Sequence, residues 1–166
     1  MSTPEPRWPA AHVPALSRTL GDPHFPNGER AALKRMALDG AAPLALHRLL
    51  LRHVDEAWQG ERWLPDWRLL VCALAIQRDG GFDPARPLGQ ALAEARYAES
   101  RLERLLSADG DTLRALALRA ARQIAAKGIA CDWRHLADLL FATSPEARER
   151  INTRIARDYY RNLKED

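Results

Sequence analysis

Five basic residues near the end of the sequence have the spacing of a single helical face. They recur at intervals of 4, 3, 4 and 3 residues, as Arg150, Arg154, Arg157, Arg161 and Lys164. At about 100° per residue, this spacing puts all five in one band of an α-helix, about 80° wide and about 21 Å long. Glu149 and Asp158 fall outside the band on the same helical projection.

The chemistry that suits this row is the binding of a polyanion. A guanidinium group presents a planar fork of donors that matches phosphate, whereas like charges four residues apart on a helix repel each other by a few tenths of a kcal/mol. The row therefore predicts a nucleic-acid-binding surface. The alternative is a solvated face whose charge is balanced by acids of neighbouring helices.

Two other segments add candidate nucleic-acid contacts. Arg30, Lys34 and Arg35 share one predicted helix, and Arg119 and Arg122 lie opposite the apolar stripe of another. From residue 112 to residue 131 the sequence contains four bases and no acid. These five residues join the C-terminal row as predicted nucleic-acid-binding residues. Tyr160, beside that row, is a candidate for stacking on a base.

Motifs of catalysis and metal binding are missing from the sequence. It contains no phosphate-binding glycine loop, no nucleophile elbow and no Cys-x-x-Cys pair. Cys131 and His135 are four residues apart, but two ligands do not make a zinc site. We therefore expect no enzyme activity, no catalytic residue, no metal and no cofactor. Two cysteines, Cys72 and Cys131, are too few for a disulfide framework and favour a reducing compartment.

The composition is that of a folded protein of one domain or two small lobes. The chain has 166 residues, 46% of them hydrophobic and 28% charged, with a formal net charge of +3. No apolar run reaches the roughly 18 to 20 residues that span a bilayer, and the N-terminus has no signal-like apolar segment. These features predict a cytoplasmic protein. All but three of the 25 bases are arginine, which fits a nucleic-acid partner and equally a GC-rich genome.

The elements that must position the basic residues are helices, because β-branched residues are scarce and helical periodicity dominates after residue 28. We predict an all-α helical bundle with two small lobes, residues 28–80 and 88–166, joined near residues 81–87. Residues 1–27 are predicted to form a flexible, Pro-rich arm with at most a short helix at 14–20. Residues 66–77 are apolar nearly all round and predict a central buried helix. The other predicted helices span residues 29–38, 43–58, 88–96, 98–106, 112–127, 133–141 and 145–163.

Four segments, in their order and spacing, resemble one known family. They are residues 28–35 (GERAALKR), 99–106 (ESRLERLL), 132–140 (DWRHLADLL) and 154–160 (RIARDYY). Together they are similar to the CasB family, the small subunit of the type I-E CRISPR surveillance complex, Cascade. The resemblance covers most of residues 28–160.

The resemblance implies a two-lobed, all-α, non-catalytic subunit that takes part in antiviral defence. It implies two copies in the complex and contacts with the repeated backbone subunits and the large subunit. It also implies that basic residues help to hold the hybrid of CRISPR RNA and target DNA, and the displaced DNA strand. The family's terminal basic motif maps onto Arg154 and Arg157, and its front motif onto Arg30, Lys34 and Arg35.

Two other functions stay open at this point. Residues 133–141, the turn 142–144 and the last helix could form a helix-turn-helix DNA-binding regulator. The first turn of its recognition helix would carry Glu146 and Glu149, which do not suit a groove lined by phosphates. A helical protein–protein adaptor without nucleic acid is the second alternative. No membrane partner is predicted.

Overall fold

The computed structural model describes residues 5–36 and 38–164, and within them the chain is all-α, as predicted. The only β-type pairing among these residues is an isolated bridge between Phe82 and Cys131. No described helix is long and apolar enough to cross a membrane. The helices are α1 (Val13–Gly21), α2 (Asn27–Lys34), α3 (Leu44–His53), α4 (Leu64–Ala75), α5 (Leu88–Glu94), α6 (Glu99–Ser107), α7 (Gly110–Ala126), α8 (Arg134–Phe141) and α9 (Pro145–Asn162).

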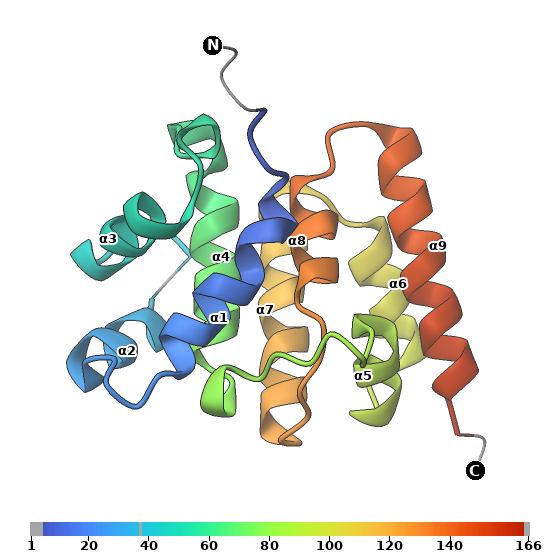
Figure 1. Cartoon of the computed structure of the whole chain (residues 1–166). Helices are drawn as coiled ribbons and strands as arrows, with labels where there is room; N and C mark the ends of the chain where they lie inside the picture. The colour runs from blue at the N-terminus through green and yellow to red at the C-terminus, as the bar shows by residue number, and fades with distance from the viewer. Residues whose placement is uncertain (1–4, 37, 165–166) are drawn as a thin grey trace.

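Helix α4 is the buried centre that its composition predicts. Every residue of α4 from Asp66 to Ala75 is buried, because an element that is apolar nearly all round must be covered on all sides. In Figure 1, α1, α7 and α8 lie around α4, with α2 and α3 on one side of the molecule and α5, α6 and α9 on the other. One hydrophobic core runs through both halves, from Leu33 and Leu46 to Leu92 and Ile155.

The N-terminal residues are more ordered than the sequence suggests. The short helix expected at residues 14–20 is present as α1, but its Val13 and Leu16 are completely buried. A 3-10 helix, η1 (Pro9–His12), precedes it and packs against α8. Both Pro9 and Pro14 occupy first turns, where no backbone N–H is needed. Where the sequence suggests a loose arm, residues 9–21 are thus helical and contribute Val13, Leu16 and Leu20 to the core.

Two predicted helices are shorter than expected. Helix α2 ends at Lys34 instead of residue 38, and the thiol of Cys72 in α4 contacts the carbonyl oxygens of Lys34 and Met36 (3.7 and 3.9 Å). Because the helix ends at Lys34, both Leu33 and Met36 reach the core. Residue 37 lies outside the described residues. Helix α3 ends at His53, and two 3-10 turns, η2 (Glu56–Trp58) and η3 (Glu61–Trp63), replace its predicted last turn.

Hydrogen bonds hold residues 81–86 of the connection between the predicted lobes. Asp83 N donates to Cys131 O, and Cys131 N donates to Gly81 O, both at 3.0 Å. The Arg86 guanidinium donates to Ala130 O at 3.0 Å. These bonds join residues 81–86 to the segment before α8. The division into two lobes on either side of residues 81–87 stays a prediction.

Candidate nucleic-acid interface

Helix α9 forms one edge of the molecule and carries the C-terminal basic row (Figure 1). Its start is the one that the sequence predicts: Ser144 Oγ accepts a hydrogen bond from Ala147 N at 3.1 Å, and Pro145 occupies the first turn. Ile155 and Tyr159 are fully buried, whereas Leu163, four residues after Tyr159, is 37% exposed. Gly89 of α5 lies against the α9 backbone at Ile155 and Tyr159, so that α9 is anchored along its inner side.

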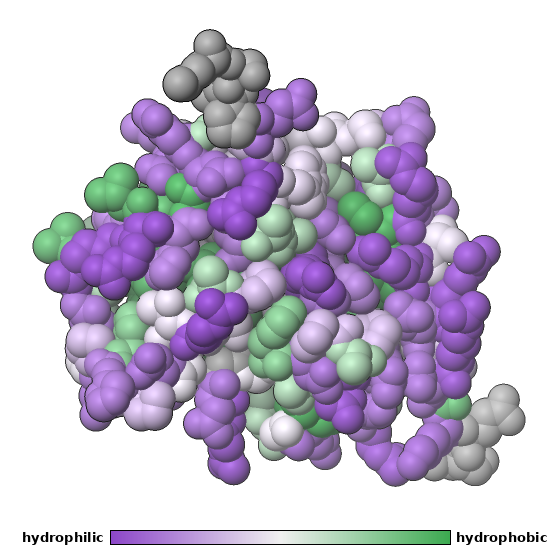
Figure 2. All heavy atoms as spheres, in the orientation of Figure 1, coloured by the Kyte–Doolittle hydropathy of each residue, from purple (hydrophilic) through white to green (hydrophobic). Residues whose placement is uncertain are grey.

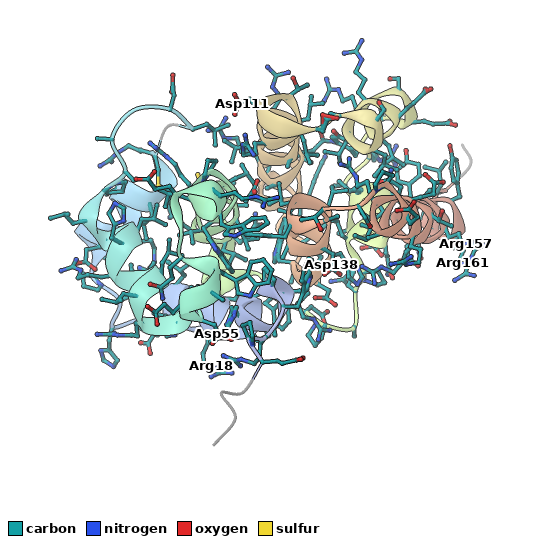
Figure 3. All side chains as sticks on the ribbon, turned by 90° about the horizontal axis from the view of Figure 1, so that it is seen from above. Arg18, Asp55, Asp111, Asp138, Arg157 and Arg161 are labelled. Carbon is teal, nitrogen blue, oxygen red and sulfur yellow. The ribbon has the colours of Figure 1, made fainter. Side chains whose placement is uncertain are left out.

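The opposite side of α9 presents the predicted row to solvent. We define the basic face of α9 as Arg150, Arg154, Arg157, Arg161 and Lys164, and all five are exposed. Figure 3 shows Arg157 and Arg161 projecting away from the body of the molecule. Figure 2 shows hydrophilic side chains over most of this edge. Among residues 5–36 and 38–164, no carboxylate forms an ion pair with Arg150, Arg157, Arg161 or Lys164.

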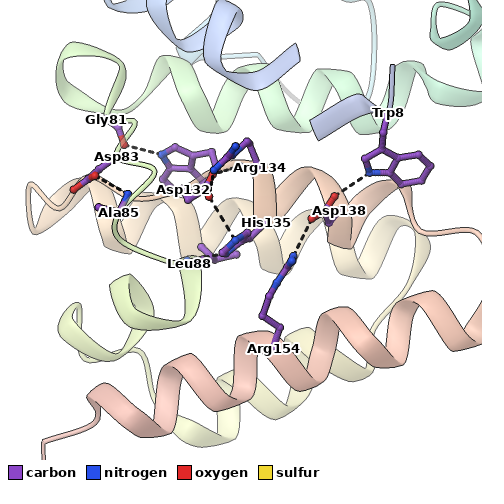
Figure 4. Close-up of polar contacts among 11 residues, drawn as sticks. Trp8, Gly81, Asp83, Ala85, Leu88, Asp132, Arg134, His135, Asp138 and Arg154 are labelled. Carbon is purple, nitrogen blue, oxygen red and sulfur yellow. Dashed lines mark hydrogen bonds and ion pairs between the residues drawn. The ribbon is translucent and has the colours of Figure 1, made fainter. Parts of the chain in front are cut away.

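The fifth member of the face, Arg154, has a partner that the sequence did not reveal. Its Nη2 donates to Asp138 Oδ2 of α8 at 2.8 Å, and Asp138 Oδ1 accepts from the Trp8 indole Nε1 at 2.9 Å (Figure 4). Asp138 is 16 residues away from Arg154 and on another helix, so no local pattern pointed to it. Glu146, Glu149 and Asp158 of α9 border the same open surface. The basic face of α9 is thus cationic along its length, and the carboxylate of Asp138 contacts it at its middle.

Arg30, a predicted contact, is committed to the local fold instead. Its guanidinium donates to Leu20 O (3.0 Å), Asp22 O (2.8 Å) and Asn27 Oδ1 (3.2 Å), and it lies over the ring of Phe25. Arg30 therefore holds the turn between α1 and α2. No residue pattern predicts this role, because the acceptors are mostly backbone carbonyl oxygens, which every residue has.

The remaining predicted contacts lie outside the basic face of α9, on α2 and α7. Lys34 and Arg35 at the end of α2 are exposed, as are Arg119 and Arg122 on α7. Arg122 lies close enough to Cys72 to lower its pKa, although burial has the larger, opposite effect, and Cys72 contacts Lys34 O. Helices α2 and α9 lie at opposite ends of the molecule (Figure 1). The ten predicted residues are thus not brought together on one surface.

The described residues contain no group of three His, Cys, Asp or Glu side chains that could hold a metal ion. Cys131 is completely buried, and burial raises the pKa of its thiol, with Asp132 adding to the rise. His135 is committed to the fold: its Nδ1 accepts from Leu88 N at the start of α5 at 3.2 Å (Figure 4).

The contact between His135 and α5 makes stability depend on pH. Burial lowers the pKa of His135, and Arg154 lowers it further, while Asp132, Asp138 and Asp158 act in the opposite direction. Because the unfolded chain binds the proton more readily, the free energy of unfolding should fall as the pH decreases below about 6.5. We expect His135→Asn, whose carbonyl can accept the Leu88 N–H, to reduce this slope in urea unfolding between pH 7.5 and 5.5. His47→Asn, at an exposed position of α3, is the matched control; equal slopes for both variants would contradict the prediction.

The family model described as CRISPR-associated protein Cse2 matches residues 29–160. No curated protein and no solved structure matches the chain. The matched range contains most of α2, all of α3 to α8 and most of α9, including Arg150, Arg154 and Arg157 of the basic face.

Proposed function

Because the chain belongs to the CRISPR-associated Cse2 family and is a subunit of a CRISPR Cascade complex, we propose that it is a non-catalytic, cytoplasmic subunit that holds nucleic acid through the basic face of α9. In this role it stabilises the hybrid of CRISPR RNA and target DNA and retains the displaced DNA strand. In RNA-guided recognition, base pairing reads the sequence, so that protein subunits need only follow backbone shape and charge. A row of cations on one helix is suited to that task.

One observation carries the proposal: the row is exposed and four of its five cations lack a carboxylate partner among the described residues. Along α9 the cations succeed one another about every 5 Å. Guanidinium forks at this spacing can contact successive phosphates of one strand without reading base edges. Tyr160 lies beside the basic face of α9 and is half exposed, and its hydroxyl donates to Glu99. Stacking of the Tyr160 ring on a base is part of the proposal.

Two further surfaces fit the other proposed contacts. Lys34 and Arg35 at the end of α2, and Arg119 and Arg122 on α7, are exposed and give further places for contacts with a nucleic-acid backbone. Leu44 and Leu51 of α3 are apolar and more than 70% exposed, and Figure 2 shows apolar atoms gathered on that side of the molecule. Exposed apolar residues of this kind suit contacts with the other Cascade subunits or with a second copy of this chain.

A helix-turn-helix regulator is supported less well. Helices α8 and α9 run antiparallel beside each other (Figure 1), whereas the two helices of that motif cross at a steep angle. Glu146 and Glu149 are also exposed in the first turns of α9, where a recognition helix would meet the DNA. Both features favour a backbone clamp over a sequence reader.

The proposal is tested by the salt dependence of binding. Each phosphate of a single strand that is neutralised contributes about −0.7 to the slope of log K against log [salt], so that four or five contacts give about −3 to −3.5. We expect this slope in fluorescence anisotropy of the full chain with a labelled single-stranded oligonucleotide between 50 and 200 mM salt. Arg157→Gln should make the slope shallower by about 0.7.

Two oligonucleotides of equal length and unrelated sequence are the control, and they should bind equally. A slope near zero would contradict the proposal. So would a strong preference for one sequence, which would favour the regulator instead.

A further inference from the structure

Asp138 accepts a hydrogen bond from Arg154 at the middle of the basic face. We infer that this carboxylate competes with the nucleic-acid backbone for Arg154, and thereby limits how tightly the face binds. The inference rests on the proposed function and adds a residue to it. Asp138 does not itself touch the ligand: it acts through Arg154, as a positioning residue.

The geometry gives Arg154 two alternative acceptors. Its side chain is 44% exposed and that of Asp138 21% exposed, so the ion pair stands at the border between the face and the interior. Arg154 uses Nη2 for Asp138, and its position in the row is between Arg150 and Arg157, one helical turn from each. A phosphate that follows the row must therefore meet a guanidinium that is already engaged by a carboxylate.

The carboxylate is held in place independently of Arg154. Its second oxygen accepts from the Trp8 indole, and the Trp8 ring packs edge-on against Trp58 with 5.4 Å between ring centroids. Trp58 Nε1 in turn donates to Arg7 O at 2.7 Å, and Arg7 N donates to Asp55 Oδ2 at 2.7 Å. Asp138 thus keeps a fixed position and one partner when Arg154 turns towards a phosphate.

Two effects oppose phosphate binding at Arg154. The ion pair with Asp138 must be exchanged, and the freed carboxylate then repels the phosphate that replaces it. A partly exposed ion pair contributes up to about a fivefold change in an equilibrium constant. We therefore expect Asp138→Asn to bind the single-stranded oligonucleotide about two- to fivefold more tightly than the unchanged chain at 100 mM salt. The asparagine side chain has the same shape, and its Oδ1 can still accept from Trp8.

A control variant and a second background distinguish competition for Arg154 from the general effect of removing one negative charge. Asp158→Asn removes the same charge from the border of the face, but Asp158 forms no ion pair with Arg154 among the described residues. The gain from Asp138→Asn should exceed that from Asp158→Asn in the unchanged chain and should decrease to about the gain from Asp158→Asn when Arg154→Gln is also present, because only the general effect of charge then remains. Equal gains from Asp138→Asn with and without Arg154 would overturn the inference.

A measurement on the unchanged chain does not depend on the affinity of any variant. On addition of the oligonucleotide, the indole N–H resonance of Trp8 should shift, because its acceptor Asp138 loses Arg154. The indole of Trp133, which donates to Gly81 O at 3.0 Å, should not shift; Trp8→Phe identifies the Trp8 signal. An unmoved Trp8 signal at saturation would overturn the inference.

The two proposals fail in different ways. If the unchanged chain binds with the expected salt slope but Asp138→Asn leaves the affinity unchanged or weakens it, only the role of Asp138 is wrong. If the unchanged chain shows no salt-dependent binding, the proposed function itself is wrong.

Discussion

Charge reversal at Arg157 and Arg161 should weaken binding of the target duplex by the assembled Cascade complex by about 10- to 100-fold at physiological salt. Both side chains are exposed, and neither has a carboxylate partner among the described residues. Reversal therefore removes two phosphate contacts and adds repulsion without disturbing an existing pair. The salt slope should also become shallower by about 1.4. The measurement is a titration of the complex with a duplex that matches its guide, at several salt concentrations.

The control for this experiment is the double reversal Arg18→Glu/Arg78→Glu. It changes the net charge by the same amount at two exposed positions away from α9; Figure 3 shows Arg18 far from Arg157 and Arg161. Target binding should be nearly unchanged in this control. Equal losses in both double variants would mean that net charge, and not the basic face of α9, controls binding, and unchanged binding in Arg157→Glu/Arg161→Glu would refute the clamp.

Gly89→Ala should destabilise the fold by about 2 kcal/mol or more. A Cβ atom built at Gly89 would lie 2.3 Å from Ile155 O and 2.9 Å from Tyr159 N, both in the backbone of α9. Backbone atoms cannot turn aside as a flexible side chain can, so α5 and α9 must separate. This loss exceeds the gain of about 1 kcal/mol that alanine gives over glycine within a helix. For a chain of this length the change corresponds to a decrease in Tm of about 4 to 8 °C.

Thermal and urea unfolding of Gly89→Ala measure this effect, and Gly28→Ala is its control. Gly28 lies in the first turn of α2, has no atom within 4 Å of a built Cβ, and does not require a positive φ. Its replacement should leave stability unchanged or slightly increased. Unfolding of Gly89→Ala at the temperature of the unchanged chain would show that α5 and α9 do not pack as closely as described.

The helices could be predicted from the sequence because their signals are local. Ser144 and Pro145 mark the start of α9 within a few residues, and the apolar stretch 66–77 identifies the buried helix without knowledge of its neighbours. The helical repeat alone was enough to predict that the basic residues from Arg150 to Lys164 share one face. Proline was misleading at residues 9–14 for the same reason: it signals a break in general, but Pro9 and Pro14 stand where a helix begins.

The sequence by itself determined which residues share a helix and which side of α9 is cationic, because both follow from a repeat of 3.6 residues along one continuous segment. Only the tertiary structure decided which of the predicted nucleic-acid-binding cations have no partner within the protein among the described residues. Arg30 is engaged by carbonyl oxygens of the turn between α1 and α2, and Arg154 by a carboxylate of α8 that Trp8 holds. Partners of this kind are brought together by the packing of distant segments, and the same packing sets the charge that the basic face offers to a nucleic acid.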